Sequence, residues 1–172
     1  CSCALTLAEA GMRVRLYEAR AIASGASGRN GGFALRGGAM RYDAARSRFG
    51  PERAAAFWRL TERALDRMAE LAGDALRRVG SLRLAADEQE RDELRAEYGA
   101  LLADGFAVEW VDELPERLAG AYPAAILHPE DAALHPGRWV RRLAVQAADA
   151  GAGIREGTPV VSLDELDAEH VV

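Results

Sequence analysis

The spacing of hydrophobic positions in this 172-residue chain predicts that it begins with a helix, which is followed at once by a strand. Residues 1–10 place apolar and small side chains at helical spacing, and Gly11 follows where a left-handed residue can end a helix. Residues 13–18 alternate, with Val14 and Leu16 on one face, as in a half-buried strand. This order predicts the second half of a βαβ unit.

The central part of the chain predicts short elements in irregular order. Apolar residues recur at three- and four-residue steps from residue 51 to 79, which indicates one long amphipathic helix. Further helices are expected over residues 87–102 and 113–119. Strands are expected over residues 80–85, 106–111, 125–128 and 132–134. Because these strands lack a regular βαβ rhythm, we expect a mixed or antiparallel sheet here.

The end of the chain returns to an α/β pattern. Pro136 and Gly137 open a predicted helix, which ends near Gly151 and Gly153. Strands are expected to begin at Ile154, to cover residues 158–161 and to start again at residue 170. Together with the first segment, this pattern predicts an α/β fold.

Composition and charge narrow the class of protein. A hydrophobic fraction of 49% in a chain of this length is enough for a sizeable core. The net charge of -5, with acidic and basic residues interspersed, provides no basic stripe for nucleic acid. No apolar run approaches the roughly 20 residues of a membrane span, and Cys1 and Cys3 are too close for a zinc pair. We expect a cytoplasmic enzyme without a metal, membrane or nucleic-acid partner.

Glu18 stands at the end of the first predicted strand. In a dinucleotide-binding βαβ unit, the second strand ends in a carboxylate that accepts hydrogen bonds from the adenosine ribose. Glu18 occupies that position, although an exposed loop carboxylate would give the same pattern. If Ala4 is the usual small residue of the helix, the GxGxxG turn belongs before Cys1. We therefore expect the chain to lack that turn.

Residues 21–38 form a glycine-rich loop. Such a density of glycine indicates that the backbone conformation of this loop matters. A flexible linker is the alternative, but linkers rarely place an Arg-Asn pair between glycines. Residues 17–20 (YEAR) and 25–32 (GASGRNGG) resemble the D-amino-acid-oxidase-like family of FAD-dependent oxidoreductases, which includes glycine and sarcosine oxidases. Within that family the motif is most similar to gamma-glutamylputrescine oxidase-like members. Residues 80–82 (GSL), 134–136 (LHP) and 157–160 (GTPV) agree as well.

The resemblance implies a bound FAD and a set of residues that contact it. The FAD is expected to be noncovalent, because no histidine lies between Ala19 and Gly50, where some sarcosine-oxidase-like relatives carry one early in the loop. The implied cofactor-binding residues are Glu18, Ala19, Arg20, Ser24, Gly25, Ala26, Ser27, Gly28, Arg29, Asn30, Gly31, Gly32 and Val160.

Individual roles follow from the same resemblance. The glycine N–H groups and the Ser27 hydroxyl would face the pyrophosphate, and residues 29–32 would lie nearest the isoalloxazine ring. Arg29 would stabilise negative charge on reduced flavin or, alternatively, form a structural salt bridge. The backbone of Val160 would meet the adenine, or the residue would be a plain core valine.

The implied reaction is hydride transfer from a carbon bearing an amino group to flavin N5, imine hydrolysis and reoxidation by oxygen with release of peroxide. The substrate is a small amine or amino acid, and no oligomeric state is assigned. No acid–base residue is assigned either, because His128, His135 and His170 have no partner at informative spacing, and His135 is expected to be structural.

The expected architecture is a partial Rossmann-like FAD-binding domain of residues 1–49 and 136–172, with an inserted α+β substrate or cap domain over residues 50–135. Family members are longer, so we expect a fragment that is truncated at both ends and catalytically inactive by itself. The alternatives are a non-catalytic binding or structural remnant and, less favoured, an NAD-dependent dehydrogenase, since Glu18 would suit the ribose of NAD equally well.

Overall fold

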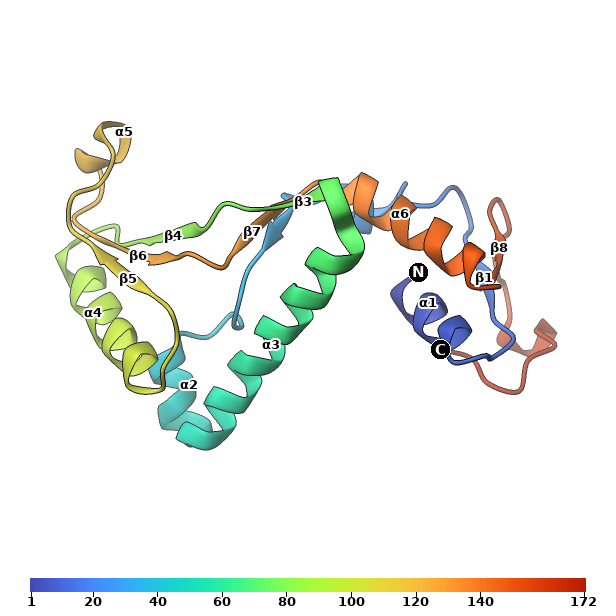
Figure 1. The fold of residues 1–172 in the computed structure, drawn as a ribbon, viewed down its shortest axis with the longest axis horizontal. Helices are drawn as coiled ribbons and strands as arrows, with labels where there is room; N and C mark the ends of the chain where they lie inside the picture. Colours follow the sequence, from blue (N-terminus) through green and yellow to red (C-terminus); the bar gives the residue numbers. More distant parts are fainter. The chain divides into compact units, whose positions relative to one another are not determined.

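The computed structural model describes residues 1–172, except for the side chain of Glu165. The chain forms two compact units (Figure 1). The first combines Cys1–Gly32 with His135–Val172, and the second is Phe33–Leu134. Helices and strands alternate in the α/β fashion that the sequence predicted. Among the described residues, no helix is both long and apolar enough to cross a membrane.

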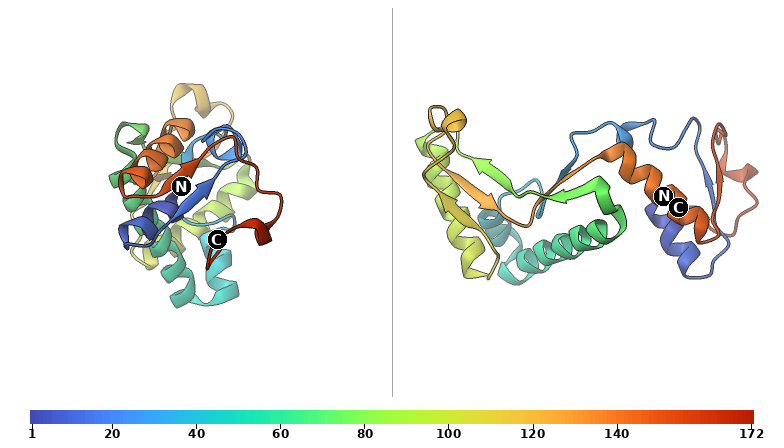
Figure 2. Two further views of the ribbon diagram at one scale, coloured as in Figure 1. Left: turned by 90° about the vertical axis from the view of Figure 1, so that its right-hand side faces the viewer. Right: turned by 45° about the horizontal axis from the view of Figure 1, so that its top comes forward.

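The first unit brings the two ends of the chain together. Its elements are α1 (Ser2–Glu9), β1 (Arg15–Tyr17), the 3-10 turn η1 (Ala26–Gly28), α6 (Pro136–Asp149), β8 (Gly153–Arg155) and η3 (Leu163–Glu165). Helix α1 packs on α6, and both bury small residues, which allows close approach (Figure 1). Strands β1 and β8 pair in parallel, and Figure 2 shows them side by side.

The end of α1 follows the predicted glycine stop. Gly11 has a φ of 80°, its N–H donates to Ala8 O at 2.9 Å, and the Met12 N–H donates to Leu7 O at 3.1 Å. These two bonds form a Schellman motif, which turns the chain directly into β1.

Two strands predicted near the end of the chain were wrong. In the described structure no strand covers residues 158–161 or residues 170–172. Instead, Gly157 takes a φ of 61° and donates to Arg20 O at 2.7 Å, and Thr158 donates to Glu18 O at 2.9 Å. Pro159 has no N–H to continue a ladder. The chain therefore crosses the end of β1 instead of extending a strand.

The second unit contains two antiparallel three-stranded sheets, in the orders β2-β7-β3 and β4-β6-β5. Of the two arrangements expected, a mixed or an antiparallel sheet, the second is therefore observed. The elements are β2 (Phe33–Ala34), α2 (Tyr42–Phe49), α3 (Pro51–Ala72), η2 (Gly73–Ala75), β3 (Leu76–Arg78), β4 (Ser81–Leu84), α4 (Glu88–Ala103), β5 (Glu109–Val111), α5 (Glu116–Ala119), β6 (Ala125–His128) and β7 (Ala132–Leu134).

The long helix is shorter than its hydrophobic pattern predicted. It ends at Ala72 because Gly73 adopts φ 54° and ψ -127°, and Leu76–Arg78 then pairs with β7. Helix α2 was not predicted. It packs against α3 and α4, and β2 pairs with β7, so residues 33–49 lie in the second unit. The observed division falls at residues 32/33, whereas the sequence analysis placed it at 49/50.

An aromatic cluster forms the core of the second unit. Tyr42 is fully buried, and its ring meets Trp58 edge-on at 4.8 Å and Phe106 at 5.2 Å between centroids. Phe57, which precedes Trp58, is 48% exposed instead. Gly37 has a φ of 81°, and a Cβ there would lie 2.4 Å from the Trp58 ring. Glycine is thus required at residue 37 by both backbone and packing.

Candidate cofactor-binding site

All the residues that the sequence analysis assigned to the cofactor lie in the first unit. Apart from Val160, they form two neighbouring groups. The first is the end of β1 with Glu18, and the second is the glycine turn, which we define as residues 24–32. A Cβ built on Gly25 would lie 3.8 Å from the Arg20 guanidinium, which places the two groups next to each other.

Glu18 is fixed by its backbone and by one carboxylate oxygen. Its N–H donates to Arg155 O at 2.9 Å, and its carbonyl accepts from Thr158. Carboxylate Oε1 accepts the Arg20 N–H at 2.9 Å. Within the described residues, Oε2 has no hydrogen-bond partner. One carboxylate oxygen is therefore held in place while the other is available to accept from a hydroxyl.

The glycine turn is closed by the side chain of Asn30. Its Nδ2 donates to Ala26 O at 3.2 Å and to Ser27 O at 3.1 Å, and its Oδ1 accepts the Gly32 N–H at 2.9 Å. The amide uses both its donor and its acceptor within the turn. Asn30 therefore shapes the turn, and Arg29 beside it is exposed.

Gly28 is required by contact with the chain itself. A Cβ at this position would lie 1.9 Å from Ala23 O, which no side chain can tolerate. Ala23 has a φ of 68°, in the left-handed region that non-glycine residues rarely adopt. The first turn of α6 packs against the same residue, because a Cβ on Gly137 would be 3.7 Å from Gly28 O.

Two serines of the glycine turn differ in their surroundings. Ser27, which the sequence analysis favoured for the pyrophosphate, is exposed. The Ser24 Oγ is shielded from solvent and lacks a hydrogen-bond partner among the described residues. Buried hydroxyls without partners are uncommon, so this oxygen fits a site that a ligand completes.

The remaining assigned residues offer free groups. Arg29 forms no ion pair with any described residue, so the structural salt bridge considered for it is not made here. Val160 is 42% exposed and is not a core valine. A free carboxylate oxygen, an unpaired hydroxyl, turn N–H groups and a free guanidinium match the needs of a ribose, a pyrophosphate and a reduced flavin. The residues present therefore fit FAD.

The three histidines lie elsewhere. Burial lowers the pKa of His128 to about 4, and its Nδ1 lies 3.3 Å from the Arg36 guanidinium in the second unit. His135 caps α6, where Nδ1 accepts the Arg138 N–H at 3.3 Å, and this confirms its structural role. His170 is exposed beside Glu169. Across the described residues, no group of three or more His, Cys, Asp or Glu side chains is arranged to hold a metal ion.

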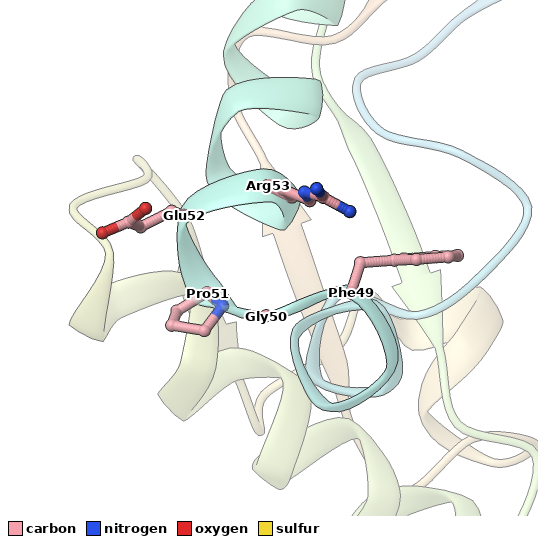
Figure 3. A pocket seen from close by; sticks show the side chains of 5 residues that line it. All are labelled: Phe49, Gly50, Pro51, Glu52 and Arg53. Atoms are coloured by element: carbon pink, nitrogen blue, oxygen red, sulfur yellow. The ribbon is translucent and has the colours of Figure 1, made fainter.

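A surface hollow of about 300 Å³ lies at the start of α3 (Figure 3). Its lining is Phe49, Gly50, Pro51, Glu52 and Arg53, and Glu52 points away from Phe49 and Arg53. None of the assigned cofactor residues lines it, whereas the Glu18 carboxylate and the unpartnered Ser24 Oγ both lie in the first unit. The end of β1 is therefore the better candidate site.

The sequence analysis missed one polar contact in the site. The carboxylate of Glu156 accepts the Ile22 N–H at 2.5 Å, across 134 positions of sequence. A signal existed, because Glu156 follows β8 as Glu18 follows β1, and parallel strands place their carboxyl ends together. The contact could not be predicted from the sequence, because the pairing of β1 with β8 was not known.

Fold and site together define an α/β protein with the features of a dinucleotide-binding site at the ends of two parallel strands. The chain belongs to the family described as FAD dependent oxidoreductase (DAO), whose model matches residues 1–172. FAD is the cofactor of this family. No sequence among the curated proteins compared matches the chain.

Solved structures of similar fold include two glycine oxidases. The glycine oxidase of Geobacillus kaustophilus is 30% identical in sequence, with a TM-score of 0.69, and the match covers 91% of this chain and 43% of the oxidase chain. That of Bacillus cereus has 24% identity and a TM-score of 0.66, with coverages of 93% and 44%. An FAD-bound L-alpha-glycerophosphate oxidase of Mycoplasma pneumoniae shares the fold at 17% identity and a TM-score of 0.67, with coverages of 95% and 44%. The chain thus spans less than half the length of these relatives.

Proposed function

We propose that the first unit contributes half of a noncovalent FAD site, and that the protein it belongs to oxidises the C–N bond of a small amine or amino acid. The observation that carries the proposal is the grouping of Glu18, the glycine turn and Val160 in one unit, each with groups free to bind. Family membership supplies the cofactor class. The NAD-dependent dehydrogenase is disfavoured, because the family whose model matches residues 1–172 is FAD-dependent.

Each part of the site has a distinct task. The free Oε2 of Glu18 would accept from the ribose, and Ser24 Oγ with the turn N–H groups would bind the pyrophosphate. Arg29 would hold a positive charge near the flavin ring. FAD, when bound, supplies the hydride acceptor that no side chain offers. The protein's part is to orient the substrate and to exclude water and competing reactions.

The substrate class is drawn from the neighbours in fold. Two are glycine oxidases, and others are L-amino acid deaminases of Proteus. We therefore propose a small amino acid or amine as substrate, with imine hydrolysis and peroxide as the final product of oxygen reduction. The second unit is proposed as part of the substrate or cap domain. A cytoplasmic location remains a prediction.

Activity is proposed for the whole protein and not for residues 1–172 by themselves. The chain spans less than half of the glycine oxidases, and its sequence contains no GxGxxG turn to provide phosphate-binding N–H groups. We expect no amine-dependent turnover from the 172 residues alone. Turnover by the purified 172-residue chain with added FAD would contradict this part of the proposal.

The test uses the complete open reading frame that contains these residues. The expected result is a yellow protein whose FAD is released by denaturation, and whose flavin absorbance is bleached anaerobically by one or more amino acids or amines. Glu18→Ala should weaken FAD binding, whereas Glu9→Ala, which changes an exposed glutamate at the end of α1, should not. A colourless protein that binds NAD would overturn the proposal, and a flavoprotein bleached by no amine would overturn the substrate class.

A further inference from the structure

Two glutamates occupy equivalent positions, each directly after one of the two parallel strands. Strands β1 and β8 pair in register, with Tyr17 opposite Arg155, so Glu18 and Glu156 each come directly after a strand end. Ligands of α/β sheets bind at the carboxyl ends of the strands. Glu18 is already assigned to the ligand there, whereas the contact described above for Glu156 is with the Ile22 N–H.

The loop of residues 18–22 is tied to residues 155–158 by four hydrogen bonds. Three join backbone to backbone: Glu18 N–H to Arg155 O, Thr158 N–H to Glu18 O and Gly157 N–H to Arg20 O. Such bonds form with almost any side chain. The fourth, from the Ile22 N–H to the Glu156 carboxylate, depends on the identity of residue 156.

The fourth bond acts at the point where the loop enters the glycine turn. Ile22 immediately precedes Ala23, whose left-handed backbone directs its carbonyl to Gly28. The position of Ile22 therefore determines where the turn begins. A carboxylate that accepts an N–H makes a charge-assisted bond, which is stronger than a neutral one.

We infer that Glu156 is a positioning residue of the cofactor site, which holds the glycine turn in register with Glu18 by fixing the Ile22 amide. The inference rests on the proposed function. Glu156 acts through the loop and does not itself contact the ligand. Its loss lets the adenosine end and the pyrophosphate end of the site move independently.

The first measurement needs no cofactor. Hydrogen exchange at the Ile22 amide in the 172-residue chain should accelerate about tenfold in Glu156→Ala, the scale expected for one lost bond to a charged group. Glu156→Gln keeps an oxygen acceptor without the charge and should restore part of the protection. Asp167→Ala, which removes an exposed carboxylate from the same unit, should leave the amide unchanged. Equal exchange in wild type and Glu156→Ala would overturn the inference.

The second measurement addresses the cofactor in the complete open reading frame. The FAD dissociation constant should rise about tenfold in Glu156→Ala and recover partly in Glu156→Gln, with the Asp167→Ala variant as control. An FAD-binding wild type with no change in Glu156→Ala would overturn the inference and leave the proposed function intact. A wild type that binds no FAD would instead overturn the proposed function.

Discussion

Individual residues of the second unit are held by contacts that their neighbours in sequence do not supply. Arg36 has only 3% of its side chain exposed, and it binds Glu62 at 2.9 Å and Ala107 O at 2.7 Å. Asp131 accepts the Arg36 N–H at 2.9 Å and the Ser81 hydroxyl at 2.7 Å. Buried charges of this kind persist because they are paired and hydrogen-bonded. Because each of these residues depends on a specific contact, a single substitution can test that contact.

Gly28→Ala should disrupt the glycine turn, because the added Cβ would lie 1.9 Å from the Ala23 carbonyl oxygen. We expect a loss of about 2–4 kcal/mol in the free energy of unfolding, in the range of strained or overpacked sites, together with loss of FAD binding. Thermal unfolding and flavin absorbance measure the two effects. Gly25→Ala is the matched control for stability, since its Cβ would meet nothing nearer than Arg20 at 3.8 Å. Equal stability of the two variants would refute this account of the turn.

His128 should make the chain sensitive to acid. Burial holds its pKa at about 4 in the folded state, against 6.5 for a free histidine, while Asp131 raises the pKa and Arg36 and Arg83 lower it. The unfolded chain therefore takes up the proton first, and stability present above pH 6.5 is lost as the pH falls from 6.5 toward 4. His128→Gln should lose less stability than wild type over this range in urea unfolding. His170→Gln, an exposed histidine, should follow wild type.

At the scale of elements, the ends of helices determine how the site is supported. Helix α6 begins beside the glycine turn and packs on η1 as well as on α1. Its first turn is capped by His135, an unusual residue at this position. The ends of α1 and α3 are set by Gly11 and Gly73, both of which take positive φ. Such ends fix where the following loop or strand starts.

His135→Ala should weaken α6 by removing the acceptor for the Arg138 N–H. The expected cost is about 1 kcal/mol in thermal or chemical unfolding, the usual value for a lost N-cap. His135→Asn should retain the cap and the stability of wild type. If His135→Ala and His135→Asn unfold at the same temperature, the capping role assigned to His135 is wrong.

At the scale of the whole molecule, the chain divides into a unit that carries the candidate site and a unit that does not. The first unit is built from both ends of the chain, and the second is one continuous segment. A ligand bound at the ends of β1 and β8 would contact residues that are far apart in sequence. Ligand binding should therefore change hydrogen exchange in the first unit and leave the second unit unchanged.

FAD binding should protect residues 18–32 and 155–160 from hydrogen exchange, because it orders the loop, the glycine turn and the segment after β8. The measurement compares apoprotein with FAD-bound protein, both made from the complete open reading frame. The helices α3 and α4 of the second unit provide the internal reference. Protection centred on the hollow at Phe49–Arg53, with none near Glu18, would move the site to the second unit.

The sequence by itself determined several of the local elements and identified the candidate loop. Helix α4, strands β6 and β7 and the end of α1 follow from hydrophobic period, capping residues and glycine position. Glu18 and the glycine turn were identifiable because a strand end and a cluster of glycines are local signals. These features depend on residues that are close along the chain.

Only the tertiary structure decided which distant segments meet. Residues 76–78 leave the helix that their hydrophobic pattern predicted because they pair with β7, and α2 joins the second unit by packing on α3 and α4. The bond from Ile22 to Glu156 spans 134 positions and arises from the parallel pairing of β1 and β8. Pairing of this kind depends on the burial and hydrogen bonding of both partners at once, which no local pattern contains.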